Sequence, residues 1–434
     1  MNWDSMKKGL HKFAMTIQRN KYIQAISVGM SRTMPFMIVG ALFTLTLSIG
    51  WEPYIEFLDS TFLGELLTLP TQFTTNIISI YVVYFIGHAM SESFGHDGPL
   101  GGLFSLFAFL IVTPLGVFEV GESMVEALPM EWLGSKGLFV AIIFGLIISR
   151  IYAYILDHNW IIKMPEGVPP TVEKSFSGLI PVFVIAFLAI AIRGLFMATD
   201  FGNIHSCIYG IVQTPLESLG GTLPALIIMT LMISILWFFG IHGMAVVYNV
   251  MLPVLLSLDM QNLAAFQAGE VMPNIIGDAF IWNICLGGSG QTIGLVILMA
   301  FRSRSKQFST LGKLSLVPGV FNINEPLIFG IPMVLNVKFV VPFILAPLTG
   351  GLFAYFVTAI GIVPPMNGVY LPLGVPMVIM GFFYGSWKIA ALQLVLVIMS
   401  VVIYYPFFKK ADEEKYQEEQ AAIQTDTAAT LANE

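Results

Sequence analysis

The run from Ser177 to Thr199, SGLIPVFVIAFLAIAIRGLFMAT, decides the fold class. It is apolar over the roughly 20 residues that a helix needs to cross a bilayer, and Arg193 is its only charged residue. Windows of similar character cover residues 24–50, 68–92, 99–118, 136–157, 222–241, 275–301, 337–362 and 387–408. We therefore predict an all-α polytopic membrane protein with about ten transmembrane helices.

The composition of the whole chain supports this prediction. Of its 434 residues, 56 % are hydrophobic and only 11 % are charged. Soluble domains carry about 25 % charged residues, and a soluble core of this size could not shield so much apolar surface. The net charge of −7 and the lack of a basic patch argue against binding of nucleic acid. A soluble enzyme and a disordered scaffold are excluded as well.

Lys and Arg residues set the expected orientation, because they concentrate on the cytoplasmic side of membrane proteins. The basic, amphipathic segment 1–21 is predicted to be cytoplasmic, and so are the basic stretch 302–313 and the end of the last span at 409–410. The acidic loops 51–67 and 118–133 contain no Lys or Arg, and we place them outside. Both termini are therefore expected in the cytoplasm.

Two further apolar stretches, 243–258 and 314–335, are interrupted by Gly, Pro and polar residues, and we predict that they form re-entrant hairpins. The windows above then leave the basic stretch 302–313 on the outer side. Either a further crossing lies within 243–274, or one segment enters the membrane without crossing it. Termini on the same side require an even number of crossings, and we favour ten.

The character of the chain changes near residue 200, from ordinary apolar helices to runs rich in Gly, Pro and Asn. We divide the chain into a cytoplasmic N-terminus (1–21), a transmembrane scaffold half (22–200), a transport half with the re-entrant segments (201–408) and an acidic tail (409–434). The tail is expected to be cytoplasmic, helix-prone and frayed.

The most informative polar motif is NINEPLIFG at 322–330. Glu325 lies there in an apolar stretch, between Asn322, Asn324 and residues that prevent a straight helix. A charged group within a span is costly unless it is paired or faces water, so Glu325 is a candidate functional residue. A carboxylate beside amides supplies the acceptors and donors that sugar hydroxyl groups need. The alternative is a structural Glu paired with a basic residue of another helix.

Two other interrupted stretches carry polar groups. GIHG at 240–243 places His242 between small residues, where its ring is accessible to a hydroxyl group or a proton. A core histidine is the alternative. Asn274, Asp278 and Trp282 recur at every fourth residue, which places them on one face of a helix. The Gly-rich turn that follows is either close to a ligand, an anion site at a helix start, or a plain tight turn. Beside Glu325 and His242, the candidate binding residues are Asn249, Trp282, Asn283, Gly288, Ser289, Asn322 and Asn324.

Together these motifs resemble the membrane-embedded IIC component of the bacterial sugar phosphotransferase system. The resemblance rests on the basic amphipathic start, on Gly-Ile-His-Gly at 240–243, on Trp-Asn-Ile-Cys-Leu-Gly-Gly-Ser-Gly at 282–290 and on the motif at 322–330. It covers residues 5–410 and is strongest for the lactose, cellobiose and diacetylchitobiose branch.

The resemblance implies a homodimer of ten-helix subunits in the bacterial inner membrane, with the dimer contact in the N-terminal half (22–200) and two re-entrant hairpins in the sugar-binding half. It also implies that a β-linked disaccharide, such as cellobiose or diacetylchitobiose, crosses by alternating access, while Glu325 and His242 contact its C6 hydroxyl. The phosphoryl group would come from a phosphocysteine of a separate IIB protein, supplied from phosphoenolpyruvate through IIA. Residues 363–368, VPPMNG, depart from the aromatic and threonine pattern of many relatives. This departure affects the sugar preference if the loop lines the site.

Three rival functions remain at this point. A proton-coupled sugar symporter would use Glu325 and His242 as its proton pair. A sugar sensor would bind without transporting, and a channel is least supported because no ring of charged groups lines the spans. The sequence has no Walker motif and no metal-ligand cluster, so we expect neither a metal nor a cofactor.

Overall fold

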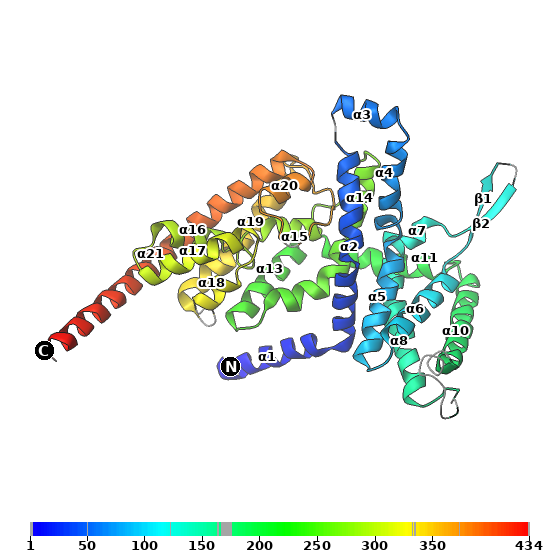
Figure 1. Cartoon of the computed structure of the whole chain (residues 1–434), viewed down its shortest axis with the longest axis horizontal. Coiled ribbons are helices and arrows are strands. Elements are labelled where there is room, and N and C mark those ends of the chain that lie inside the picture. Colours follow the sequence, from blue (N-terminus) through cyan, green and yellow to red (C-terminus); the bar gives the residue numbers. More distant parts are fainter. Residues whose placement is uncertain are drawn as a thin grey trace. The chain divides into compact units, whose positions relative to one another are not determined.

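The computed structural model describes residues 3–49, 51–121, 123–162, 165, 176–331, 333, 336–372 and 374–432. This part of the chain is mostly helical (Figure 1). It also contains one antiparallel hairpin, in which β1 (Gly116–Val120) pairs with β2 (Ser123–Ala127), and Gly116 lies opposite Ala127. The prediction of an all-α chain missed this hairpin. Its acidic residues favoured a loop, whereas Val117, Phe118 and Val125 favour strands.

Packing divides the chain into two compact units. Unit I comprises Thr16–Leu219 and Leu252–Gln261, and unit II comprises Met1–Met15, Gly220–Met251 and Asn262–Glu434. The two units are therefore interleaved in sequence, since the middle of one long helix belongs to unit I while its ends belong to unit II. The functional division of the chain near residue 200 stays a prediction.

Unit I is a bundle in which α5 packs against α2, α6 and α8 (Figure 1). Close approach depends on small residues: Ser105 Oγ and Ser149 Oγ lie 2.9 Å apart beside Gly87. Arg193 Nη1 donates to Ile111 O over 2.7 Å and to Thr113 O over 3.2 Å, so the charged group within the apolar run has two backbone acceptors. The elements of unit I are α2 (Lys21–Leu47), α3 (Glu52–Asp59), α4 (Leu63–Gln72), η1 (Thr75–Ile77), α5 (Ile78–Ser93), α6 (Gly98–Val112), α7 (Met130–Leu133), η2 (Ser135–Gly137), α8 (Leu138–Asp157), α10 (Leu179–Met197), α11 (Ile204–Ile208), η3 (Tyr209–Gln213) and α12 (Thr214–Gly220).

Unit II contains the candidate site. Here α16 packs against α17 and α21, and α19 packs against α13 and α21. Its elements are α13 (Leu223–Phe238), η4 (Met244–Tyr248), α15 (Asp278–Ile284), α16 (Ile293–Arg302), α17 (Lys306–Val320), α18 (Glu325–Gly330), α19 (Val337–Ala359), α20 (Ile379–Phe383) and α21 (Trp387–Ala432). The helices α1 (Trp3–Arg19) and α14 (Asn249–Gln267) are divided between the two units, and the last residue of α12, Gly220, belongs to unit II.

The described residues include seven helices that are long and apolar enough to cross a membrane, or eight if a pair bent by 72° is one span. One of them, Met244–Gln267, includes the stretch 243–258 that was predicted to be re-entrant, and it is long and apolar enough to supply the further crossing considered within 243–274. The prediction of one continuous helix over 275–301 is wrong, because the helix α15 ends at Ile284 and the next helix, α16, begins only at Ile293. The total of ten helices and the two re-entrant hairpins stay predictions.

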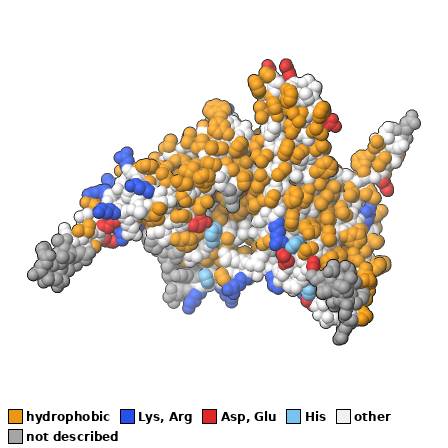
Figure 2. Space-filling view, viewed as in Figure 1, with side chains coloured by type: hydrophobic (Ala, Val, Ile, Leu, Met, Phe, Trp, Pro, Cys, Tyr) orange, Lys and Arg blue, Asp and Glu red, His pale blue; other side chains and the backbone are white. Residues whose placement is uncertain are grey.

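Apolar side chains cover much of the visible surface (Figure 2). On α10, Phe187 is 70 % exposed, Ile190 58 % and Leu195 65 %. Such a surface would be unfavourable in water and is expected where a helix contacts lipid.

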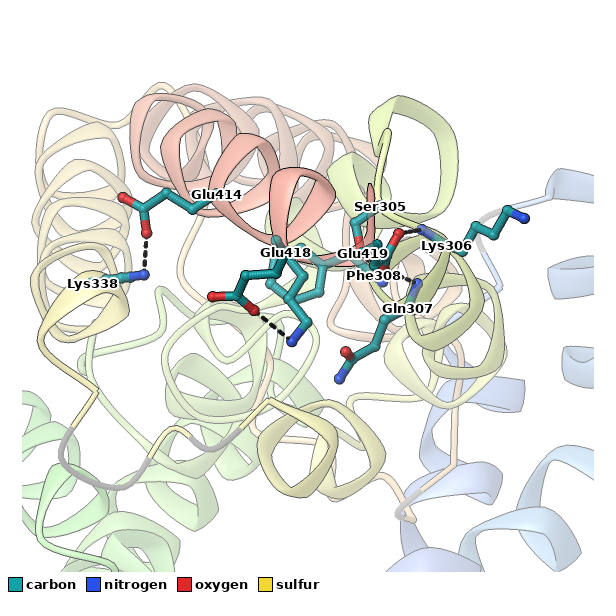
Figure 3. Close-up of polar contacts among 9 residues, drawn as sticks. Ser305, Lys306, Gln307, Phe308, Lys338, Glu414, Glu418 and Glu419 are labelled. Atoms are coloured by element: carbon teal, nitrogen blue, oxygen red, sulfur yellow. Dashed lines mark hydrogen bonds and ion pairs between the residues drawn. The ribbon is translucent and has the colours of Figure 1, made fainter. Parts of the chain in front are cut away.

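The acidic tail is not frayed at its start, contrary to the sequence prediction. The helix α21 continues into it, and its carboxylates bind the free N–H groups at the first turn of α17 (Figure 3). Glu419 accepts from Lys306 N over 2.8 Å and from Ser305 Oγ over 2.6 Å. Asp412, which is buried, accepts from Arg304 N over 2.8 Å and from Ser305 N over 3.1 Å, directly before the first turn. Anionic groups are favourable at the positive end of a helix, so these contacts fix where α17 begins.

Candidate functional site

The motif at 322–330 begins where α17 ends. Asn322 has a φ of 62°, a left-handed conformation that Asn tolerates better than most residues. Ile323 N donates to Pro318 O over 3.0 Å and Asn322 N donates to Gly319 O over 3.1 Å, which satisfies the last carbonyls of the helix. A new helix, α18, begins at Glu325 with Pro in its first turn. The motif is therefore a tight break between two helices, as its Pro and Asn residues predict.

The Gly-rich turn connects α15 to α16. Gly287 and Gly288 have φ angles of 72° and 81°, which side chains other than Gly rarely adopt. Gly288 is required for a second reason: a Cβ atom there would lie 2.6 Å from Cγ of Asn324. The turn therefore allows the backbone of one loop to approach the side chain of the other.

Hydrogen bonds join the two turns directly. Asn324 is buried, and its Nδ2 donates to Ser289 O over 2.7 Å and to Thr292 Oγ1 over 3.3 Å. Gly287 N donates to Asn322 Oδ1 over 3.0 Å. Four of the predicted residues, Asn322, Asn324, Gly288 and Ser289, thus form one rigid junction. Both asparagines support the junction, and their role as ligand-binding groups stays a prediction.

The helix α21 holds the Gly-rich turn from the other side, which the sequence prediction missed. Tyr404 OH donates to Gly290 O over 2.8 Å, and Ser400 Oγ donates to Gln291 O over 2.5 Å. Gln393 Nε2 donates to Asn283 Oδ1 over 2.9 Å. A signal was present, because these three polar residues recur at spacings of seven and four along one face of an apolar helix.

Asn283 is fully buried, and its Nδ2 has no hydrogen-bond partner within the described part of the chain. A buried donor without a partner costs about 1–3 kcal/mol. The unsatisfied amide lies in the helix that leads into the Gly-rich turn, which is consistent with a place close to a polar ligand.

His242 is exposed, as expected for a side chain between glycines. Ala245 N donates to its Nδ1 over 3.1 Å, so the neutral ring carries its proton on Nε2. No described residue bonds to Nε2, which is therefore available as a donor. The ring centroid lies 4.5 Å from that of Trp237.

Trp282 and Asn249 each form a hydrogen bond with a residue of the helix η4. Tyr248 OH donates to Asp278 Oδ1 over 2.5 Å, and Trp282 Nε1 donates to Tyr248 OH over 3.1 Å. Asn249 Nδ2 donates to Ala245 O over 3.0 Å. The predicted helix face is wrong at one position, because α15 begins at Asp278 and Asn274 lies outside it. Asn274 N instead donates to Asn262 Oδ1 over 2.9 Å.

Glu325 is exposed at the start of α18. No ion pair with a described basic residue involves it, and none of the described contacts joins it to His242. Its carboxylate is therefore an accessible acceptor that extends from a rigid junction. Within the ranges that the structure covers, no three His, Cys, Asp or Glu side chains gather in a way that could hold a metal ion.

Comparison with known proteins identifies the family. Residues 27–347 match the family described as "Phosphotransferase system, EIIC". The chain is 37 % identical to the lichenan permease IIC component of Bacillus subtilis (strain 168), over 93 % of this chain and 92 % of the relative. It is also 37 % identical to the cellobiose-specific EIIC component of Geobacillus stearothermophilus, over 93 % of each. The chain belongs to the EIIC family of the phosphotransferase system.

The EIIC assignment extends to the fold. The structure is similar to that of ChbC, the IIC component from the N,N′-diacetylchitobiose-specific phosphotransferase system, with a TM-score of 0.91 and 36 % identity. The similarity covers 96 % of this chain and 99 % of ChbC. The resemblance inferred from the sequence motifs is thus confirmed, and this EIIC chain is a multi-span membrane permease. A proton-coupled symporter is not favoured by these similarities.

Proposed function

We propose that this EIIC chain binds a β-linked disaccharide, such as cellobiose or diacetylchitobiose, at the junction of its two turns. The names of the similar proteins support this class of sugar, since they specify lichenan, cellobiose and N,N′-diacetylchitobiose. The observation that carries the proposal is the direct bonding of Asn324 to the Gly-rich turn. It holds the start of α18, and with it the carboxylate of Glu325, on a rigid support.

Glu325 and His242 would act on the C6 hydroxyl of the sugar. A carboxylate accepts a hydrogen bond from this hydroxyl, and Nε2–H of His242 donates one to its oxygen. The hydroxyl oxygen would then attack the phosphorus of a phosphocysteine on IIB, the cysteine thiolate would leave, and Glu325 would accept the hydroxyl proton. A general base of this kind works best when its pKa is near the operating pH.

Phosphorylation would also make transport irreversible, because a sugar phosphate does not recross an apolar membrane. The permease then needs only a site that faces the two sides alternately. We propose a homodimer that works with separate IIB and IIA proteins, with both termini in the cytoplasm, where the phosphoryl donor is found.

The direct test is binding of radiolabelled cellobiose, diacetylchitobiose and lactose to the purified permease. Saturable binding of one disaccharide, lost in both Glu325→Ala and His242→Ala, would support the site. Glu325→Gln separates the two roles of the carboxylate. If Glu325 is a general base, Glu325→Gln should lose phosphorylation in the presence of phospho-IIB far more than it loses sugar binding. An equal loss of both would mean that Glu325 only orients the hydroxyl.

Liposome flux then distinguishes the proposal from its rivals. Uptake should require IIB and appear as sugar phosphate. Uptake without IIB that collapses with an uncoupler would indicate a symporter, and binding without flux would indicate a sensor.

A further inference from the structure

A cavity of about 400 Å³ lies in unit II, between the end of α19 and the start of α21. None of the candidate sugar-site residues lines it. Its walls are largely apolar and include Phe353, Val357, Ile362, Trp387, Leu392 and Val395. Several of these side chains are also exposed at the surface: Ile362 is 57 % exposed and Val395 41 %. The cavity is therefore an open apolar groove rather than an internal void.

The depth of the groove in the membrane follows from the length of α21. An α-helix rises about 1.5 Å per residue, so Lys388 and Lys409 are separated by about 30 Å. This matches the thickness of the hydrocarbon core of a bilayer, about 30 Å. The residues between these two lysines are almost all apolar. From this match we infer that Lys388 lies at one membrane surface and Lys409 at the other. Trp387, which is 65 % exposed, is typical of the interface between lipid and water.

Positive charge at the mouth of the groove is not balanced. Lys388 lines the groove and is exposed, and none of the described acidic residues forms an ion pair with it. The first turn of α21 has no acidic residue either, so the positive end of the helix dipole adds to the charge of Lys388. An anionic group at this depth would be attracted to it.

The lining disfavours a sugar as the natural occupant, because the described residues that line the groove include no carboxylate or amide side chain to bind hydroxyl groups. An interface between two copies of the chain is disfavoured as well, since it would bury the Lys388 ammonium without a described acid to pair with it. An acyl chain below an anionic headgroup matches both the apolar walls and the charge.

We propose that this groove binds an anionic phospholipid. One acyl chain occupies the space between α19 and α21, and the phosphate contacts the ammonium group of Lys388. The lipid belongs to the leaflet at the Lys388 end of α21, opposite the leaflet at the Lys409 end. The inference is independent of the sugar that the permease carries.

Native mass spectrometry of the full chain in detergent, titrated with phosphatidylglycerol or phosphatidylcholine, tests the proposal. The wild-type chain should bind phosphatidylglycerol more tightly than phosphatidylcholine. Lys388→Gln should reduce that preference about fivefold, because this is the contribution of one lysine to the affinity for an anionic lipid surface. Ala391→Phe fills the groove and should abolish binding of both lipids there.

Matched variants control for general effects on the helix. Lys409→Gln removes a lysine at the other end of α21, and Leu394→Phe adds an aromatic ring on the same helix outside the groove. Both should bind phosphatidylglycerol like the wild type. Equal affinity of the wild type for the two lipids, or unchanged binding in Ala391→Phe, would overturn the proposal. A loss of dimer in Ala391→Phe with unchanged lipid binding would assign the groove to contact between copies instead.

Discussion

Replacing Gly288 by alanine is predicted to damage both the stability of the permease and its sugar site. The left-handed backbone with a φ of 81° costs a residue with a Cβ roughly 1–2 kcal/mol. The new Cβ would also lie 2.6 Å from Cγ of Asn324 and would displace that side chain from Ser289 O. The lost hydrogen bond of a buried amide adds about 1–3 kcal/mol. The sum is a loss of about 2–5 kcal/mol in the free energy of unfolding.

Two other glycines serve as controls for the backbone cost and for the clash with Asn324. Gly95 has a φ of 83° but open space around its Cβ position, so Gly95→Ala should show only the backbone cost. Gly194 lies within α10, also in open space, and Gly194→Ala should stabilise by roughly 0.5–1 kcal/mol. Unfolding in mixed detergent micelles measures stability, and radiolabelled disaccharide measures binding.

The expected result is that only Gly288→Ala loses sugar binding, because only this variant displaces the residue before Glu325. If Gly288→Ala is no less stable than Gly95→Ala and binds sugar normally, the described junction of the two turns is wrong. The double variant with Asn324→Ala should show less than the sum of the two single effects, since it removes the atoms that clash.

Three further predictions concern unit II. Tyr404→Phe leaves the Gly290 carbonyl without its donor and should lower the free energy of unfolding by about 1–3 kcal/mol, measured in the same micelles; an unchanged value would argue against this contact. Asp412→Asn with Glu419→Gln removes both carboxylates from the first turn of α17, and the amides there should exchange hydrogen faster in mass spectrometry; unchanged exchange would mean that the tail does not hold the helix. Val378 has a φ of 72°, unusual for a β-branched residue, so Val378→Gly should raise thermal stability, and a clear fall would contradict the strain.

The candidate site shows how far sequence motifs can lead. The break at 322–325 and the turn around Gly288 were both visible, because Gly, Pro and Asn mark places where a helix cannot continue. The motifs did not reveal that the asparagines bind the other turn rather than the solvent, since each is paired with atoms more than 30 residues away. Ser400 and Tyr404 lie on a polar helix face that the sequence shows, but nothing local to them indicates which carbonyls they bind.

The sequence alone determined that this chain is a polytopic membrane protein of the EIIC type. Apolar runs of bilayer length follow from composition, and the family motifs are contiguous in the chain. The tertiary structure decided which helices are continuous, where the Gly-rich turn meets the Asn motif, and how the tail caps α17. These features depend on hydrogen bonds between segments far apart in sequence, and a local pattern of residues does not specify its distant partner.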